Sequence, residues 1–553
     1  QLMLLELAFC SLDDSTLVLS KPDCGTGSFN HGTMKSKLLL SKCTQLKCVK
    51  LVYCGLEDST MDLSESTALT TLSLEFVTMK GKLLLSKCTH LTCLEMAYCN
   101  LNDSTLDLSE SNYLTCLRLK HVTMKGKMRS PRCAQLRFLE LSQCSLDHIT
   151  FDLSQSNCLT ELSLDGVNMT IKLLPSMCTQ LKCLRLAHCS LNDASLDLSE
   201  CNCLIDVRLE DMKVKLVVSK CTQLSCLELA HCILDYTTLD LSESDSLTEL
   251  SLKYVTMKGK LLISKCKKLK NLDLAYCEVD AATLDLSGSK CLTKLSLKEV
   301  TMKGQLLLSN CTHLQCLKLV CFGLDDATLD LSGSPCLVKF IVQNVTMKSK
   351  FMVSKCTKLK CSDLTYYSVN YVTLDFSNSN VLTKLVCRDV TMNVKLLISK
   401  CTLLKCLELV CCGLDDAILD LSESNCLTEL SLEDVNIKGK LLLINCTQLN
   451  CLGLAYCSFD DAMLDLTENN SLTKLSLKHV TIKGKLLLFK CTQLKCLELA
   501  QCSLENATLD LSESNCLTEV IMEAVTRKGD VLISNCTDWK VVNLLNRCLD
   551  NAN

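Results

Sequence analysis

The sequence contains few aromatic residues and few prolines, and its net charge is small. Its 553 residues include 4 prolines and 1 tryptophan, only 4% are aromatic, and the net charge is −4. No apolar run approaches the ~18 residues of a membrane-spanning helix. No linker, low-complexity segment or charge block divides the chain. We therefore expect one domain with no membrane span, and no overall field that would favour a nucleic acid.

Catalytic and metal-binding motifs are also missing. The chain has no glycine-rich phosphate loop, no GxSxG and no HExxH, and no CxxC pair recurs with a second pair or with histidines behind it. These absences predict a protein that is not an enzyme and that holds no cofactor or metal. His188, Asp211 and His231 fall at equivalent repeat positions and would suit zinc, but two histidines sharing a position need no metal to explain them.

What the sequence does contain is a repeat. A leucine that lies three residues after a cysteine recurs every 45 residues, with one interval of 43 between Leu181 and Leu224. The anchors are Leu46, Leu91, Leu136, Leu181, Leu224, Leu269, Leu314, Leu359, Leu404, Leu449 and Leu494. A fixed period of this size predicts a solenoid, in which each unit packs only on its neighbours.

Each 45-residue period consists of two related halves. The first, the A rung, follows LxxLxLxxCxL from Leu46, and the second, the B rung, follows the same template from Leu69. The structural repeat is therefore 22 to 23 residues. LxL segments predict short strands with alternating inward leucines, stacked as a parallel concave sheet. On the convex side, TLDLS and KLLLS also alternate, which favours extended or irregular structure over helices.

This template resembles the leucine-rich-repeat family, whose units follow LxxLxLxxNxL, over nearly the whole chain. Cysteine replaces the usual asparagine in A rungs, and valine replaces it in B rungs. The A rung is similar to the cysteine-containing subclass found in F-box substrate receptors. The resemblance implies a β-rich solenoid of the α/β type that recognises a protein or other macromolecular ligand.

By the same resemblance, the first functional expectation is the sensor part of a longer, cytoplasmic innate immune receptor of the nucleotide-binding type. The alternatives are a substrate-recruiting or scaffolding adaptor of the F-box type, and an extracellular recognition protein. We divide the chain into divergent N-terminal repeats (1–45), a regular array (46–538) and a truncated C-terminal repeat (539–553). Because it begins and ends within a unit, we expect it to be part of a longer protein.

Cysteine is the most unusual component, at 44 residues, and most of it keeps the phase of the repeat. Eleven cysteines lie three residues before an A-rung leucine, and a twelfth, Cys536, lies at the same phase before Trp539; ten more are at the ninth A position, nine at the third and six before a B-rung leucine. We interpret them as small buried apolar residues in a reducing compartment. Eight N-x-S/T sequons point instead to secretion: Asn102, Asn168, Asn310, Asn344, Asn445, Asn469, Asn506 and Asn535.

The copies differ most at the eighth A position and at the seventh and eighth B positions, just past the predicted concave strands. We predict a ligand-binding surface there, with Tyr and His as anchors and charges for selection. Neutral drift is the competing interpretation. The candidate residues are Tyr53, Phe76, Tyr98, His121, Gln143, His188, Asp211, His231, Tyr254, Tyr276, Glu299, Tyr366, Asp389, Asp434, Tyr456 and His479.

The convex side offers a second candidate surface. The middle leucine of the LLL motif is equivalent to the aspartate of LDL, and it points either outward or inward depending on register. If outward, Leu84, Leu262, Leu307, Leu442 and Leu487 form an apolar stripe for a partner or for self-association.

Overall fold

The computed structural model describes residues 4–9, 27–31, 33–34, 40 and most of 44–545. The segments not described within 44–545 are 57–59, 80–81, 102–105, 125–127, 130–133, 147–149, 154–155, 168–169, 173–178, 190–194, 235–237, 258, 280–282, 301–304, 325–328, 332, 348–350, 353–354, 370–372, 391–394, 415–418, 438–440, 444, 460–463, 468, 483–485, 489–490, 505–508, 512, 528–530 and 533–540. The chain forms two compact units: unit 1 comprises 1–266 and 277–279, and unit 2 comprises 267–276 and 280–553.

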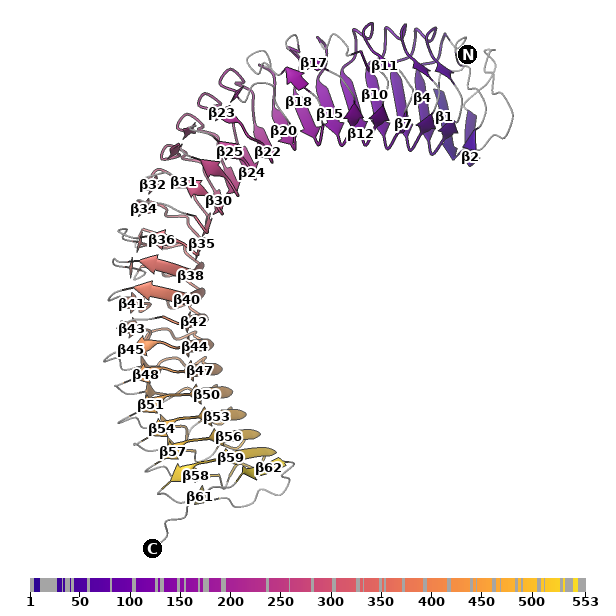
Figure 1. The fold of residues 1–553 in the computed structure, drawn as a ribbon. Coiled ribbons are helices and arrows are strands. Elements are labelled where there is room, and N and C mark those ends of the chain that lie inside the picture. Colours follow the sequence, from indigo (N-terminus) through magenta and orange to yellow (C-terminus); the bar gives the residue numbers. More distant parts are fainter. Residues whose placement is uncertain are drawn as a thin grey trace. The chain divides into compact units, whose positions relative to one another are not determined.

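Each unit is a stack of rungs in which one strand per rung joins a parallel sheet, called here the main sheet (Figure 1). In unit 1 its strands are β1 Leu4–Phe9, β2 Gly27–His31, β4 Cys48–Val52, β7 Thr71–Glu75, β10 Cys93–Ala97, β12 Cys116–Lys120, β15 Phe138–Ser142, β18 Glu161–Asp165, β20 Cys183–Ala187, β22 Asp206–Glu210, β24 Cys226–Ala230 and β27 Glu249–Lys253.

In unit 2 the main-sheet strands are β30 Asn271–Ala275, β33 Lys294–Lys298, β35 Cys316–Val320, β38 Lys339–Met347, β40 Cys361–Val369, β42 Lys384–Arg388, β44 Cys406–Val410, β47 Glu429–Glu433, β50 Cys451–Ala455, β53 Lys474–Lys478, β56 Cys496–Ala500, β59 Glu519–Glu523 and β62 Val541–Leu545. Within each unit neighbouring strands pair without slippage, so equivalent residues form columns that run across the strands.

Short strands form the rest of each rung, and the described residues contain no helix. Those that directly follow the main sheet are β3 Thr33–Met34, β5 Gly55–Leu56, β8 Thr78–Met79, β13 Thr123–Met124, β16 Ser145–Leu146, β25 Ile233–Leu234, β28 Thr256–Met257, β31 Glu278–Val279, β36 Gly323–Leu324, β45 Gly413–Leu414, β48 Asn436–Ile437, β51 Ser458–Phe459, β54 Thr481–Ile482, β57 Ser503–Leu504 and β60 Thr526–Arg527. Those on the opposite side from the main sheet are β6 Met61–Asp62, β9 Leu83–Leu84, β11 Leu106–Asp107, β14 Met128–Arg129, β17 Thr150–Asp152, β19 Thr170–Lys172, β21 Ser195–Asp197, β23 Lys215–Val217, β26 Leu239–Asp240, β29 Leu261–Leu262, β32 Thr283–Asp285, β34 Gln305–Leu307, β37 Leu329–Asp330, β39 Phe351–Met352, β41 Thr373–Asp375, β43 Lys395–Leu397, β46 Leu419–Asp420, β49 Leu441–Leu442, β52 Leu464–Asp465, β55 Leu486–Leu487, β58 Leu509–Asp510 and β61 Val531–Leu532. The predicted parallel solenoid with a mostly extended convex side is confirmed.

The LxL pattern produces the core because alternate residues of each strand point inward. In β10, Leu94 and Met96 are 0% and 1% exposed, while the residues on either side of them are half-buried. Each fully buried side chain of this size contributes about 1.5 to 3 kcal/mol. Repeating two such residues in every rung builds a core that needs few large aromatic residues, of which Phe322, Phe340 and Phe376 are fully buried.

The degenerate second rung has an unexpected position. Within the divergent N-terminal repeats, residues 21–32 follow the first A rung but lack the LxxLxL core of a regular B rung. The described part, β2, pairs with one edge of β1, while β4 pairs with the other edge. In the main sheet β1 of the first A rung therefore pairs directly with β4 of the next A rung, and β2 lies on the other side of β1.

On the convex side, the middle leucine of LLL points outward. Leu262 is 40% and Leu307 is 37% exposed, and Leu84 and Leu442 are half-buried. The side chain of Leu487 lies outside the described residues. Each of these leucines is paired across strands with an aspartate of the neighbouring A rung, as Asp240 is with Leu262. The apolar stripe is therefore interrupted by a carboxylate at every second rung.

Candidate ligand-binding face

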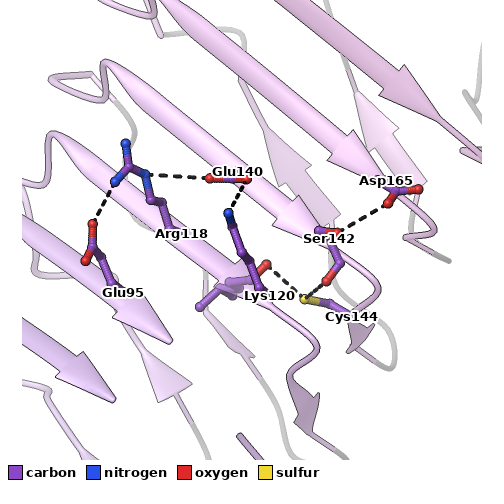
Figure 2. A network of polar contacts seen from close by, with 8 residues as sticks. Glu95, Arg118, Lys120, Glu140, Ser142, Cys144 and Asp165 are labelled. Carbon is purple, nitrogen blue, oxygen red and sulfur yellow. Dashed lines mark hydrogen bonds and ion pairs between the residues drawn. The ribbon is translucent and has the colours of Figure 1, made fainter. Parts of the chain in front are cut away.

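The outward side of the main sheet in unit 1 carries rows of opposite charges. Arg118 on β12 donates to Glu95 on β10 at 2.9 Å and lies 3.6 Å from a carboxylate oxygen of Glu140 on β15. Lys120 approaches the other oxygen of Glu140 at 2.8 Å, and Ser142 donates to Asp165 one strand further on (Figure 2). Each pair joins neighbouring rungs, so charges of opposite sign alternate along the stack.

A second charged network lies further along the same face. Arg185 on β20 and Arg208 on β22 are directly opposite each other, an arrangement that would be repulsive without a counter-ion. Asp206, whose side chain is 13% exposed, supplies it by accepting from both guanidinium groups at 3.1 Å. Arg208 also lies 3.4 Å from Glu228. The hydrogen bond to Asp206 raises the pKa of Arg208, which keeps the guanidinium charged.

These arginines lie in a hollow of about 500 Å³ on the main-sheet face, called here the arginine hollow. It is lined by Gln143, Ser163, Leu164, Asp165, Arg185, Leu186, Ala187, His188, Arg208, Leu209, Glu210, Glu228 and Ala230. Both arginine side chains are about half exposed, at 54% and 49%. Their donors are thus available to a ligand while Asp206 fixes their positions.

The residue directly after each five-residue main-sheet strand from β4 to β59 adopts a left-handed backbone conformation, as does Asn344 within the longer β38. In this corner column φ runs from 49° at Cys321 to 58° at Gly166. Such values are uncommon outside glycine, asparagine, aspartate and histidine, and they cost about 1 to 2 kcal/mol for other residues. The conformation turns each corner N–H toward the next rung, as when Tyr98 donates to the carbonyl of Lys120 at 2.7 Å. One extra hydrogen bond per rung thus offsets the strain.

Because corner residues repeat once per rung, their side chains stack. The rings of Tyr53, Phe76, Tyr98 and His121 form one continuous column, with centroids 4.5 to 4.7 Å apart. Two further stacked pairs of corner residues are described, His231 with Tyr254 in unit 1 and Tyr456 with His479 in unit 2. In unit 2, the ammonium of Lys298 lies 4.6 Å from the centre of the Tyr276 ring.

Fifteen of the sixteen predicted ligand-binding residues lie in the corner column. The exception is Tyr366, which belongs to β40 and whose side chain is outside the described residues. The corner column borders the main sheet, so these residues form a rim along its edge, while the charged networks occupy the sheet itself. Of the predicted residues, Gln143 and His188 also line the arginine hollow.

The histidine cluster considered for zinc is not assembled. His188 contacts Asp211 at 3.2 Å, and this hydrogen bond raises the pKa of the histidine, but His231 stacks on Tyr254 instead. Among the described residues, the one set of three metal-binding side chains with donor atoms within 4.8 Å of one another is Cys93, Glu95 and Cys116. His188 and Asp211 therefore form a hydrogen-bonded pair at the rim of the hollow.

Sequence reasoning missed the arginine hollow itself. Arg185, Arg208 and Glu228 occupy the same position in three successive rungs, and Asp206 lies two residues before Arg208. The available signal was their common phase, since 23 residues separate the two arginines in the sequence. The positions that vary most among the rungs lie in the neighbouring corner column, which is where the predicted residues lie.

The cysteines divide into buried and half-exposed columns. Those three residues before the A-rung leucine and at the ninth A position are buried wherever they are described, as predicted. Burial raises the pKa of the Cys266 and Cys311 thiols to about 12. At the third A position and before the B-rung leucine the described cysteines are half-buried or exposed, so the prediction of burial was wrong there. The third A position points out of the main sheet.

Comparisons with known proteins identify the fold. No protein-family model and no curated protein matches the sequence. Among solved structures, a plant peptide hormone receptor, RGFR1 in complex with RGF2, is similar with a TM-score of 0.52 and 16% identity, covering 90% of this chain and 81% of the receptor chain. The Arabidopsis receptor kinase HAESA, in complex with the peptide hormone IDA and the co-receptor SERK1, gives 0.47 and 16%, covering 85% of each chain.

A leucine-rich-repeat protein of Leptospira interrogans gives a TM-score of 0.36 and 14% identity, covering 64% of this chain and 88% of its own. The described residues contain no helix that is long and apolar enough to cross a membrane. The repeat template, the unslipped parallel main sheet and the likeness to the plant receptor agree: the chain has the fold of the leucine-rich-repeat proteins.

Proposed function

We propose that the chain is a non-enzymatic recognition module that binds a polypeptide ligand on the main-sheet face of unit 1. The observation that carries this proposal is the arginine hollow. Its two guanidinium groups are held by Asp206 yet remain half exposed, so they are positioned before any ligand arrives. Fixed, partly exposed donors lower the conformational entropy lost on binding.

The charge pattern favours a polypeptide over a nucleic acid. Arg185 and Arg208 are accompanied in the hollow by the carboxylates of Asp165, Glu210 and Glu228. A polyphosphate backbone would meet these carboxylates at close range, which is unfavourable. A peptide with both acidic and basic side chains can match such a surface, because complementary charges then meet rung by rung.

The corner column contributes the rim of the proposed site. Tyr98, His121, His188 and Asp211 project beside the main sheet, and Tyr98 is 50% exposed. Stacking holds the aromatic members rigidly, which suits anchor residues. We propose that corner residues near the hollow select the ligand, and that those of unit 2, such as Tyr456, extend the same role along its own sheet.

For the cellular role, we propose the sensor part of a longer, cytoplasmic innate immune receptor. The support is the resemblance of the repeat template together with the many cysteines whose thiols are buried. The sequon at Asn469 is unsuited to glycosylation in the folded chain, because its side chain is buried and its amide donates to the carbonyl of Cys446 at 2.9 Å. Other sequon asparagines, such as Asn310 and Asn445, are exposed. Glycosylation at these residues would support the extracellular alternative.

The experiment is selection of a phage-displayed random peptide library on the whole chain alone, followed by measurement of the affinity of the enriched peptides for the wild type and for an Arg185→Ser/Arg208→Ser variant. A matched control is Arg388→Ser, because Arg388 is also half exposed on a main sheet and paired with a glutamate, Glu408 at 2.6 Å, but belongs to unit 2. We expect the enriched peptides to lose at least about ten-fold in affinity on the double variant and to keep it on the control.

Two results would count against the proposal. If the enriched peptides bind the double variant and the wild type equally, the hollow is not the recognition site. If the control variant loses affinity to the same extent, the effect reflects general charge and not the hollow. Thermal unfolding of all three proteins establishes that the comparison is made between folded chains.

A further inference from the structure

Two cysteines lie side by side on the main-sheet face at one place in the regular array. Cys93 on β10 and Cys116 on β12 are direct cross-strand partners. Each cysteine at the third A position is paired with residues of the neighbouring B rungs. In the regular B rungs other than that of Cys116, the residue at the equivalent position is Thr, Glu, Asp or Lys. Cys116 is therefore what sets this pair apart from the eight other A-rung cysteines at the same position.

A carboxylate completes the cluster. The two sulfur atoms and a carboxylate oxygen of Glu95 all lie within 4.8 Å of one another, and all three side chains are half-buried. Glu95 is two residues after Cys93, so it points out of the same face of the same strand. Three donors from two adjacent strands thus converge on one point above the sheet, open to solvent on the remaining side.

The surroundings suit a bound cation of charge two. Two thiolates and one carboxylate around such an ion leave one net negative charge, and the guanidinium of Arg118 is already in place to neutralise it, 2.9 Å from Glu95. Arg118 is also 3.6 Å from Glu140 (Figure 2), so Glu95 can turn toward a metal without leaving the guanidinium unpaired.

We propose that Cys93, Glu95 and Cys116 form a binding site for a divalent ion of the zinc class. Thiolate and carboxylate donors together are typical of zinc, which binds four ligands tetrahedrally. Binding releases the two thiol protons to solvent and forms two metal–sulfur bonds and one metal–oxygen bond. The fourth position faces solvent on the main-sheet face, where water or a donor atom of a second molecule completes the coordination.

Cobalt(II) provides the test, because thiolate ligation gives it a charge-transfer absorption that carboxylate or water ligation does not. The whole folded chain, reduced and stripped with a chelator, is titrated with Co²⁺ and then with Zn²⁺. We expect one tight site with thiolate absorption that Zn²⁺ abolishes. Cys93→Ser and Cys116→Ser should lose this absorption, and Glu95→Gln should keep part of it with at least about ten-fold weaker binding.

Cys451→Ser is the matched control, since Cys451 occupies the same position in β50 but pairs with Glu429 and Lys474. It should bind cobalt as the wild type does. The proposal is wrong if the wild type shows no thiolate absorption, or if Cys93→Ser and Cys451→Ser bind cobalt alike. It is also wrong if, in air and with Zn²⁺ present, dioxygen oxidises the Cys93 and Cys116 thiols to a disulfide in preference to metal uptake, as read by intact mass after alkylation.

Discussion

At the scale of single residues, two opposing effects act on the stability of the corner column: backbone strain lowers it and ring stacking raises it. Tyr98 at φ 54° loses stability to its left-handed conformation and gains it from ring contacts on both sides, 4.7 Å to Phe76 and 4.7 Å to His121. Each ring contact contributes about 0.5 to 1.5 kcal/mol, against about 1 to 2 kcal/mol of strain. The two effects are of similar size, so the outcome depends on the neighbours.

Glycine substitutions in the corner column separate the two effects. We expect Glu299→Gly to stabilise the fold by about 0.5 to 1 kcal/mol, because Glu299 at φ 49° has the strain without a ring to stack, and glycine's own entropy loss offsets part of the gain. Tyr98→Gly should destabilise by about 1 kcal/mol, since it also removes two ring contacts. Thermal unfolding of both variants measures this. Equal shifts of the same sign would refute the role of stacking.

His188 provides a prediction on pH. Its hydrogen bond with Asp211 raises its pKa above the ordinary 6.5, so the pair contributes stability that is fully present below pH 6.5 and is lost as the pH rises through the raised value. We expect Asp211→Asn to return the pKa of His188 toward 6.5, as followed by NMR of the histidine ring. Asp389→Asn, at an equivalent corner of unit 2, should leave it unchanged. An unaltered pKa in Asp211→Asn would show that another group is responsible.

At the scale of elements, the period-2 pattern was enough to predict the strands and their buried faces. Leu94 and Met96 point inward because alternation in a strand is geometric. The left-handed corner was not predictable from the propensity of Tyr and Phe, which rarely adopt it. The signals available were glycine, asparagine, aspartate and histidine at the same phase as Tyr and Phe, as at Gly166, Asn344 and Asp211, because these residue types are enriched in this conformation.

The arginine hollow illustrates a different limit of sequence reasoning. Its geometry depends on Asp206 lying between Arg185 and Arg208, and so on an unslipped pairing of β20 with β22. The repeat phase predicts that the arginines are neighbours, but it does not reveal which carboxylate holds them. The parallel sheet could therefore be predicted from the sequence, whereas the contacts between side chains on the sheet could be seen only in the structure.

The cysteine columns lead to a prediction on reactivity. Cys311 is 0% exposed and burial raises its pKa to about 12, so roughly one thiol in 10⁴ is ionised at pH 8, whereas Cys291 is exposed in a turn. We expect iodoacetamide to alkylate Cys291 in the native chain and to reach Cys311 only on unfolding. Mass spectrometry of digested samples gives the order. Similar rates for the two peptides would contradict the burial of this column.

At the scale of the whole molecule, a solenoid stabilises each rung through its two neighbours only. Leu119 on β12 is fully buried and is paired with Met96 on one side and Leu141 on the other. Removing most of its side chain leaves a cavity in one rung, with a cost of about 2 to 5 kcal/mol. In a compact globular domain such a loss spreads through a common core. In a stack it should remain local.

We therefore expect Leu119→Ala to raise hydrogen–deuterium exchange in β10, β12 and β15 and to leave β47 to β56 of unit 2 unchanged. Leu432→Ala on β47, also 0% exposed, is the reciprocal control and should raise exchange around β47 while leaving exchange in unit 1 unchanged. Exchange followed by peptide mass spectrometry resolves the two regions. If either variant raises exchange evenly along the chain, unfolding is cooperative over the whole array, and nearest-neighbour coupling is not what limits its stability. Local opening would instead mean that ligand binding at the arginine hollow stabilises the rungs around it and no others, because coupling decays from rung to rung.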